Sequence, residues 1–270
     1  MEMKIPHHII ERKPARKMSE IPKEVLVYLN SGKIETKNLV EWLAVNQFKI
    51  LDVLLEELDS KKLIKKFKAN NTENSHNKLA RLIGSQFLTE FGPEFKLSAE
   101  FKHMCNHSSD IVREWTCYSI GLHPKDSLET KLTHIYPLAN DPNPGLREVA
   151  WFALREHVSR EIDNAINLLS AWTCDDKENI RRYASEITRP RGVWCSHIQI
   201  LKENPERAIK ILNQLKSDPS RYVQNSIANW LNDASKTRPD WVWAINDKWK
   251  KNSSKETEYI LKRGLRTLKK

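Results

Sequence analysis

The fold is decided by three similar helix openings within residues 108–195: Ile111-Val112-Arg113-Glu114-Trp115, Gly145-Leu146-Arg147-Glu148-Val149 and Asn179-Ile180-Arg181-Arg182-Tyr183. Their arginines recur at intervals of 34 residues, and a fourth opening, Tyr222-Val223-Gln224-Asn225, follows after 43. An aspartate stands five residues before the aliphatic position in three of the four openings, at Asp141, Asp175 and Asp218. A repeat of roughly 20 to 50 residues predicts a solenoid, in which each helix pair buries its apolar face by stacking on its neighbours.

The rest of the chain has the composition of an all-α protein. Only 7 of its 270 residues are glycine, and its apolar residues follow helical spacing. We expect a loosely held arm at 1–19 and a single helical-repeat domain at 20–270, with a helical cap at 20–95 and repeats at 96–270. The expected helices are 22–30, 36–59 (one long or broken segment), 61–68, 78–91, 97–106, 109–121, 126–139, 143–158, 161–173, 177–187, 194–202, 205–216, 220–235, 239–251 and 255–268.

Several classes of protein are disfavoured by what the sequence lacks. No apolar run approaches the roughly 20 residues that span a bilayer, and no apolar segment follows the basic N-terminus as a secretory signal requires. The four cysteines have no C-x-x-C spacing, which is typical of reduced thiols in a cytoplasmic protein. No HExxH, EF-hand, Walker or GxGxxG motif occurs, and the nine histidines show no defensible ligand spacing. We therefore expect no metal and no cofactor.

The positive charge is concentrated in the last third of the chain. Residues 1–176 carry 24 Lys and Arg against 25 Asp and Glu, a net charge of −1. Residues 177–270 carry 21 against 10, a net charge of +11. Such segregation favours a polyanionic partner, most simply nucleic acid. The alternative is a solvated basic surface without a partner.

Two acids occupy equivalent places in neighbouring repeats. Stacking should bring Glu114 and Glu148 near each other, flanked by Trp115 and Trp151, with Trp194 just past a break between repeats. Carboxylates in an aromatic cleft suit cleavage of a glycosidic bond, because they stabilise an oxocarbenium-like sugar and position the attacking water. The alternative is a structural ladder of arginine and glutamate with tryptophans in the core.

The break itself, Thr188-Arg189-Pro190-Arg191-Gly192-Val193-Trp194, should not be helical. Its two arginines could grip phosphates around an aromatic wedge, or they could cap helix C-termini in a structural turn.

Farther along, Asn225, Asn229, Asn232 and Asp233 share helical spacing with Lys236. Asparagine is a poor interior helix residue, so these side chains either contact a phosphodiester backbone or make hydrogen bonds between buried helices. On the last helix, Lys262, Arg263 and Arg266 form either a backbone-contacting face or a solvated one.

These motifs together resemble one family. Val40-Glu41-Trp42-Leu43-Ala44-Val45-Asn46-Gln47, Val112-Arg113-Glu114-Trp115, Arg147-Glu148-Val149-Ala150-Trp151, Arg181-Arg182-Tyr183-Ala184-Ser185-Glu186, Thr188-Arg189-Pro190-Arg191 and Val223-Gln224-Asn225-Ser226-Ile227-Ala228-Asn229-Trp230-Leu231-Asn232-Asp233 carry the likeness. They resemble the HEAT-like-repeat DNA alkylation repair glycosylases, specifically the AlkC branch in its short form without an immunoglobulin-like domain.

The resemblance implies a right-handed α-α superhelix with a concave basic groove for duplex DNA. It implies a monofunctional base excision repair enzyme that hydrolyses the N-glycosidic bond of cationic bases such as 3-methyladenine. We expect a cytoplasmic protein, nucleoid-associated when bound to DNA and acting as a monomer. By motif position, Glu114 and Glu148 are the expected catalytic acids, and Trp115, Trp151 and Trp194 should line the lesion site. The residues expected to contact DNA are Arg113, Arg147, Arg181, Arg182, Arg189, Arg191, Asn225, Asn229, Asn232, Lys236, Lys262, Arg263 and Arg266.

Two positions depart from the family pattern. Gln224 stands where an arginine is usual, which predicts one weaker backbone contact, and Asn46 stands where an aspartate is expected. A third catalytic carboxylate is not assigned, and Asp233 is a candidate for it. The competing functions are a non-catalytic DNA-binding scaffold and an adaptor for an acidic protein partner.

Overall fold

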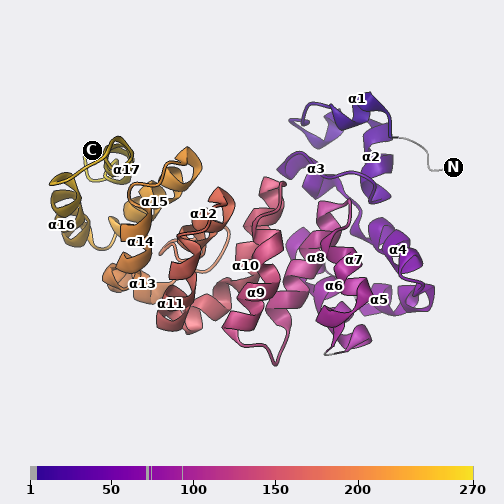
Figure 1. Ribbon diagram of the computed structural model, residues 1–270. Coiled ribbons are helices and arrows are strands. Elements are labelled where there is room, and N and C mark those ends of the chain that lie inside the picture. Colours follow the sequence, from indigo (N-terminus) through magenta and orange to yellow (C-terminus); the bar gives the residue numbers. More distant parts are fainter. Residues whose placement is uncertain (1–4, 71–72, 74, 93, 270) are drawn as a thin grey trace. The chain divides into compact units, whose positions relative to one another are not determined.

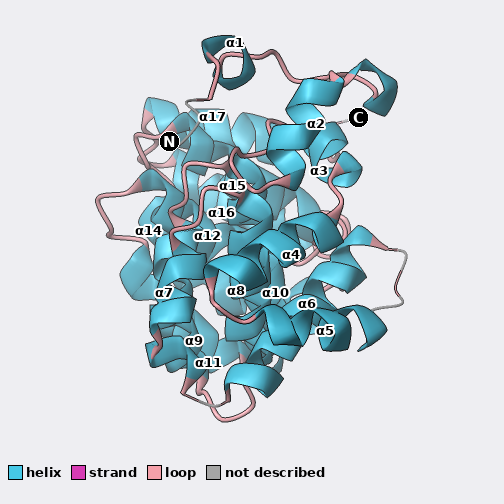
Figure 2. Cartoon of the chain, turned by 90° about the vertical axis from the view of Figure 1, so that its right-hand side faces the viewer, coloured by secondary structure: helices cyan, strands magenta, loops and turns pink. Residues whose placement is uncertain are grey.

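The computed structural model describes residues 5–70, 73, 75–92 and 94–269. Within these residues the regular structure is helical and no strand occurs (Figure 1, Figure 2). None of the helices in these ranges is long and apolar enough to cross a membrane. The all-α fold class predicted from the sequence is therefore confirmed.

The chain divides into two compact units, the first made of residues 1–125 and 141–150 and the second of residues 126–140 and 151–270. The first holds α1 (His7–Ile10), η1 (Met18–Glu20), α2 (Lys23–Asn30), α3 (Leu39–Ala44), α4 (Gln47–Glu57), η2 (Lys61–Leu63), α5 (Ile64–Asn70), α6 (His76–Phe91), η3 (Phe95–Leu97), α7 (Ala99–Cys105) and α8 (Asp110–Leu122). The second holds α9 (Leu128–Ala139), α11 (Ile162–Trp172), α12 (Glu178–Ile187), α13 (Gln199–Glu203), η4 (Pro205–Ala208), α14 (Ile209–Leu215), α15 (Arg221–Ala234), α16 (Pro239–Lys250) and α17 (Lys255–Gly264). Residues of α10 (Pro144–Arg160) belong to both units.

In the first unit, α8 is buried almost all round and packs closely on α6. Gly84 makes this possible, because a Cβ there would lie 2.7 Å from the Trp115 carbonyl oxygen. Phe87 and Phe95 stack in parallel at 5.9 Å beside Trp115 and fill the space at this crossing. Burial of such large rings supplies much of the stabilisation of a domain core.

In the second unit, α15 packs against both α12 and α17. Ile227, Trp230 and Leu231 are completely buried on it. The hydroxyls of Ser185 and Ser226 meet at 2.5 Å across the α12–α15 contact. Small polar side chains thus allow close approach while remaining hydrogen bonded.

A hydrogen-bonded turn recurs before the second helix of each repeat. The carboxylates of Asp141, Asp175 and Asp218 each accept a hydrogen bond of 2.8 Å from the backbone N–H two residues later. Asparagine and aspartate commonly fix turns in this way. The spacing of 34 residues therefore marks a repeated turn as well as a repeated helix.

The side chain six residues after each of these aspartates closes the turn from the other side. Arg147 and Arg181 donate to the carbonyl oxygens of Asp141 and Asp175 at 2.6 and 2.8 Å. Gln224 donates to the Asp218 carbonyl at 2.8 Å. Gln224 thus keeps the hydrogen bond of the turn, although it stands where an arginine is usual. Its side chain has a structural partner, which replaces the expectation of a weakened DNA contact.

The segment 36–59 follows the broken alternative. It is interrupted at Val45 and Asn46, where the Asn46 side chain accepts from the Lys49 N–H and begins α4. The helix expected at 194–202 begins only at Gln199, because residues 188–198 form a loop in which Trp194 has a positive φ of 66°.

The expected loose arm is wrong for the described residues 5–19, while residues 1–4 lie outside the described ranges. The guanidinium of Arg12 bonds to the Glu41 carboxylate at 2.7 Å and to the carbonyl oxygens of Ile9 and Glu35 at 2.9 and 2.6 Å. Arg12 and Glu41 are nearly buried, with side-chain exposures of 9% and 1%. This anchor ties the N-terminal segment to α3.

Candidate active site

Glu114 is a buried carboxylate on α8, with 1% of its surface exposed. Its Oε2 accepts a hydrogen bond of 2.8 Å from the indole N–H of Trp42 on α3. No described residue donates a hydrogen bond to the other oxygen, Oε1. A buried carboxylate oxygen without a partner is costly for stability, so its retention points to a ligand, a water molecule or a reacting group.

An imidazole completes this arrangement. The ring of His76, at the start of α6, lies against the Trp42 indole with 3.7 Å between ring centroids. Its Nε2 is 3.8 Å from Glu114 Oε2, and no described residue hydrogen bonds to that nitrogen. Three helices of the first unit therefore bring together an indole, an imidazole and a carboxylate.

The local sequence explains why Glu114 and its neighbour Trp115 face differently. Ser109 caps α8 by accepting from the Ile111 N–H, and the helix then turns about 100° per residue. Trp115 consequently points into the α6 contact, where its indole N–H donates to the Gln47 side chain at 2.9 Å. Adjacent positions in the motif thus serve different purposes, one in the site and one in the core.

A second buried acid lies one turn before Glu114. Burial raises the pKa of Asp110 to about 6, although hydrogen bonds from Thr36 lower it. Asn143 donates to the Thr36 carbonyl at 3.1 Å and approaches Asp110 Oδ2 at 3.4 Å. This polar network fixes the turn before α3 against the start of α8.

Glu148 lies on α10 and is partly buried. It belongs with Glu114 to the first unit. Its role as a second catalytic acid stays a prediction.

Two of the three tryptophans expected at the lesion site are buried, and this expectation is wrong for them. Trp115 is completely buried, and Trp151 is 5% exposed and packs on Phe152. Neither presents a surface that a base or sugar could contact. Trp194, in contrast, is 85% exposed on the loop 188–198, and its predicted contact with a lesion stays a prediction.

The ladder arginines Arg113 and Arg181 are held by protein groups, chiefly an aspartate of the following repeat rather than the glutamates of the expected ladder. Arg113 is 6% exposed and forms ion pairs with Glu35 and with Asp141, whose Oδ2 is 2.9 Å away. Arg181 binds the Asp218 carboxylate with two nitrogens at 2.6 and 3.1 Å. Their expected DNA contacts are therefore corrected to contacts between repeats.

The break residues behave similarly. Arg189 bridges two buried acids, with Nη2 at 2.8 Å from Asp233 and Nη1 at 3.1 Å from Glu186. Arg191 donates to the Asp233 carbonyl oxygen at 3.3 Å, and Arg182 forms an ion pair with Glu186 at 2.9 Å. The structure thus places Arg189 and Arg191 in a structural turn and Arg182 on α12, and Asp233 is already paired.

The asparagines of α15 make hydrogen bonds to the C-terminal segment. Their side-chain oxygens accept hydrogen bonds, Asn225 from Tyr259 at 2.8 Å, Asn229 from Arg266 at 3.0 Å and Asn232 from Thr267 at 2.8 Å. Asn232 is buried and fits the structural alternative, whereas Asn225 and Asn229 are half-buried, so their contact with DNA stays a prediction.

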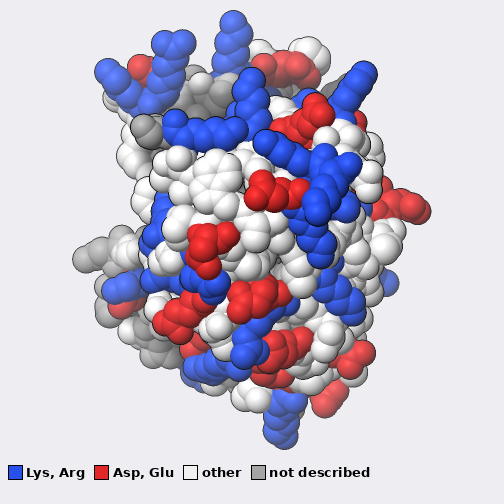
Figure 3. Space-filling view, turned by 90° about the vertical axis from the view of Figure 1, so that its left-hand side faces the viewer, with Lys and Arg blue, Asp and Glu red and all other residues white. Residues whose placement is uncertain are grey.

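For the exposed cations of the second unit, contact with DNA stays a prediction. Lys236, Lys262, Arg263 and Arg266 are exposed, although Arg266 also bonds within the protein. Figure 3 shows the C-terminal end of the chain, from which many Lys and Arg side chains project with Asp and Glu side chains among them. Arg147 donates to the Asp141 and Pro142 carbonyls and is partly buried.

Sequence reasoning missed Trp42 and His76, whose partner Glu114 lies 72 residues beyond Trp42. It also missed a group formed by Glu57, His103 and His107, the one set of three described side chains whose donor atoms could hold a metal ion. The H-x-x-x-H spacing of the two histidines was the available signal, but the acid comes from a distant helix.

Repeated helix pairs with a hydrogen-bonded turn and a buried carboxylate define a HEAT-like helical-repeat protein with a candidate catalytic acid. The profile of the DNA alkylation repair enzyme family matches residues 120–266, and the chain belongs to this family.

Two solved structures share the fold. One is the alkylpurine DNA glycosylase AlkC of Pseudomonas fluorescens bound to DNA containing an abasic site analog, with a TM-score of 0.68 and 24% identity. The alignment covers 95% of this chain and 66% of that one. The other is AlkD2 of Streptococcus mutans, with a TM-score of 0.59, 24% identity and coverage of 76% and 96%. At this identity the likeness establishes the HEAT-like helical-repeat fold.

One curated protein is also similar. It is the uncharacterized protein YhaZ of Bacillus subtilis, 40% identical over 117 residues. The match covers 43% of this chain and 32% of YhaZ, so the chain spans about a third of that relative.

Proposed function

We propose that this protein is a DNA glycosylase that hydrolyses the N-glycosidic bond of cationic alkylated bases, such as 3-methyladenine, in duplex DNA. Family membership and the fold shared with AlkC support the class of reaction. The observation that carries the proposal is Glu114, a buried carboxylate held by Trp42, to whose other oxygen no described residue donates a hydrogen bond.

The chemistry asks little of the protein beyond such a group. An alkylated purine of this kind already carries a positive charge, so it leaves without protonation by a general acid. Positive charge then develops on the sugar as the bond breaks, and a nearby carboxylate stabilises it and positions the attacking water. Glu114 is proposed for this role, with Trp42 fixing the carboxylate orientation and Glu148 as the second acid.

Binding to the duplex is assigned to exposed cations rather than to the ladder arginines. Lys236, Lys262, Arg263 and Arg266 are the candidates, and they belong to the part of the chain that carries the net charge of +11. Contacts of this kind release counterions, so the affinity should fall steeply as salt rises. A concave basic groove stays a prediction.

The test is release of methylated bases from alkylated duplex DNA by purified protein, followed by chromatography. We expect release by the wild type and a loss of about 100-fold or more in Glu114→Gln, because the amide keeps the side-chain volume but removes the charge. Glu129→Gln, at an exposed position on α9, is the matched control and should retain full activity.

Each outcome distinguishes between the candidate functions. No release by the wild type, with salt-sensitive binding to DNA, would show a non-catalytic scaffold. Release that is unchanged in Glu114→Gln would leave the activity standing and remove the proposed mechanism. Loss in Glu148→Gln as well would assign the second acid.

A further inference from the structure

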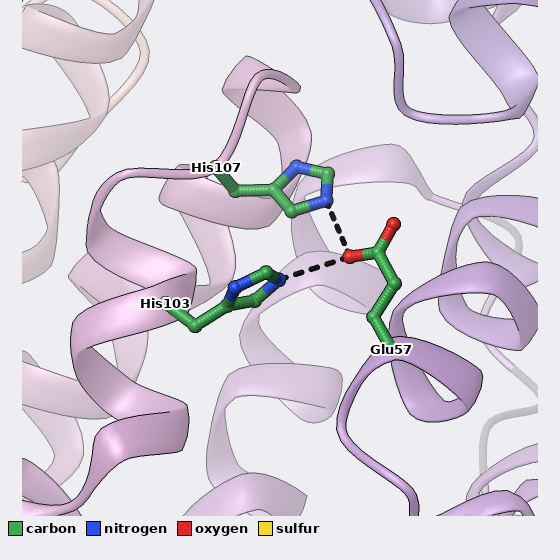
Figure 4. Close-up of side chains that lie close together, drawn as sticks. All are labelled: Glu57, His103 and His107. Atoms are coloured by element: carbon green, nitrogen blue, oxygen red, sulfur yellow. Dashed lines mark hydrogen bonds and ion pairs between the residues drawn. The ribbon is translucent and has the colours of Figure 1, made fainter. Parts of the chain in front are cut away.

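Two imidazoles and a carboxylate converge at one point in the first unit. Glu57 is the last residue of α4, His103 lies on α7, and His107 lies in the turn before α8. Glu57 Oε2 is 2.9 Å from His103 Nε2 and 3.1 Å from His107 Nε2 (Figure 4). All three donor atoms lie within 4.8 Å of one another.

The repeat pattern shows that a histidine is not needed here for the fold. His107 stands 34 residues before Asp141 and takes the place that aspartate has in the other repeats. Its Nδ1 accepts from the Ser109 N–H at 3.0 Å, and its carbonyl accepts from Arg113, as the aspartates do in their turns. An aspartate would serve this turn equally well. The imidazole adds a second nitrogen, and that nitrogen faces Glu57.

We propose that Glu57, His103 and His107 bind a divalent transition-metal ion of the Zn²⁺, Co²⁺ or Ni²⁺ type. Two imidazoles with one carboxylate form a ligand set of borderline softness, which suits these ions better than Mg²⁺ or Ca²⁺. A tetrahedral ion with bonds of about 2.0–2.1 Å places its ligand atoms roughly 3.3 Å apart. The observed separations of 2.9 and 3.1 Å are already close to that value.

The surroundings of the site allow an ion to enter. The side chains of Glu57 and His103 are 37% and 45% exposed, whereas His107 is 5% exposed. Water can therefore supply the remaining ligand from the open side.

Binding at His107 has a structural consequence. Because its Nδ1 accepts from Ser109, the hydrogen of the neutral ring is on Nε2. A metal ion at Nε2 displaces that hydrogen, and the ring must then carry it on Nδ1. The turn hydrogen bond to Ser109 is lost and leaves a buried N–H without an acceptor, which weakens the affinity by roughly 5- to 150-fold relative to a site without this conflict. Ser109 caps α8, so metal binding is coupled to the first turn of the helix that carries Glu114.

The proposal is tested by calorimetric titration of untagged protein with Zn²⁺. We expect one equivalent to bind to the wild type, and at least roughly tenfold weaker binding in His103→Gln and in Glu57→Gln. His107→Asp is the decisive variant, because it keeps the turn that three other repeats use and removes the imidazole. It should fold normally and lose the site, whereas His197→Gln, at an exposed position in the second unit, should bind like the wild type.

Titration with Co²⁺ identifies the ligand atoms. A visible spectrum without a thiolate-to-metal charge-transfer band supports nitrogen and oxygen ligands, whereas such a band would assign binding to the cysteines and overturn the proposal. Absence of binding, or equal binding by His107→Asp, would also overturn it and leave the group as a hydrogen-bonded clamp between α4 and α7. These measurements need no DNA, so their result is independent of the glycosylase activity.

Discussion

Replacing Arg113 by glutamine separates the two roles that a repeat arginine can have, joining helix pairs or contacting DNA. Gln224 shows that glutamine at this position keeps the turn, because it donates to the Asp218 carbonyl at 2.8 Å. Arg113→Gln should therefore retain the bond to the His107 carbonyl and lose only the ion pairs with Asp141 and Glu35.

The structure sets the size of the effect. The Arg113 and Asp141 side chains are 7% and 8% exposed, and removing one partner of a buried pair costs about 3–5 kcal/mol. Glu35 is 39% exposed, so its pair adds less than about 1 kcal/mol. Burial already raises the pKa of Asp141 while Arg113 lowers it, so the variant can protonate this acid. We therefore expect a loss of about 3 kcal/mol, at the lower end of the range.

Urea unfolding followed by far-ultraviolet circular dichroism measures the loss in the free energy of unfolding. Fluorescence anisotropy with a labelled duplex measures DNA binding under conditions in which the wild type and Arg113→Gln are both folded. Arg160→Gln is the control, because its pair with Glu156 is exposed and should contribute less than about 0.5 kcal/mol. An unchanged free energy of unfolding together with a tenfold weaker affinity for DNA would refute the assignment of Arg113 to the repeat contact.

Three further predictions follow from single contacts. Trp42→Phe keeps the aromatic ring but removes the hydrogen bond to Glu114, so base release should fall by about 10- to 100-fold in the same chromatographic assay, and unchanged release would disprove the positioning role. Because burial raises the folded-state pKa of Asp110 from 3.8 to about 6, the folded protein binds more protons between these values and loses stability as pH rises through this window. Asp110→Asn should therefore remove about 1 kcal/mol of the stability difference between pH 5 and pH 7.5, measured by urea unfolding, and identical pH profiles would contradict the shift. Gly84→Ala places a Cβ 2.7 Å from the Trp115 carbonyl oxygen and should cost about 1–3 kcal/mol in thermal unfolding, so a wild-type melting temperature would mean that α6 shifts freely.

Features that depend on local spacing could be predicted from the sequence. The interval of 34 residues marked a helix and a turn that recur with the same hydrogen bonds, donated to the Asp141 and Asp175 carboxylates by the N–H groups two residues on. Helical periodicity located most helices, and the largest displacement of a helix start, at Gln199, follows a loop with a positive φ at Trp194.

The direction of individual side chains could not be predicted in the same way. Glu114 and Trp115 are adjacent in one motif, yet one meets Trp42 in the candidate site and the other fills the core against α6. Arg113 looked like a DNA contact because its charge is visible in the sequence, whereas its partner Asp141 is brought to it by folding.

The sequence by itself determined the helices, their caps and the repeated turn, because these depend on residues within about six positions of one another. Tertiary structure alone decided which side chains meet: Trp42 with Glu114, and Glu57 with His103 and His107. These partners are separated by 46 to 72 residues, and their contacts depend on how each helix is rotated against its neighbours. That rotation is set by packing of the whole buried surface, as at Gly84, and no local pattern encodes it.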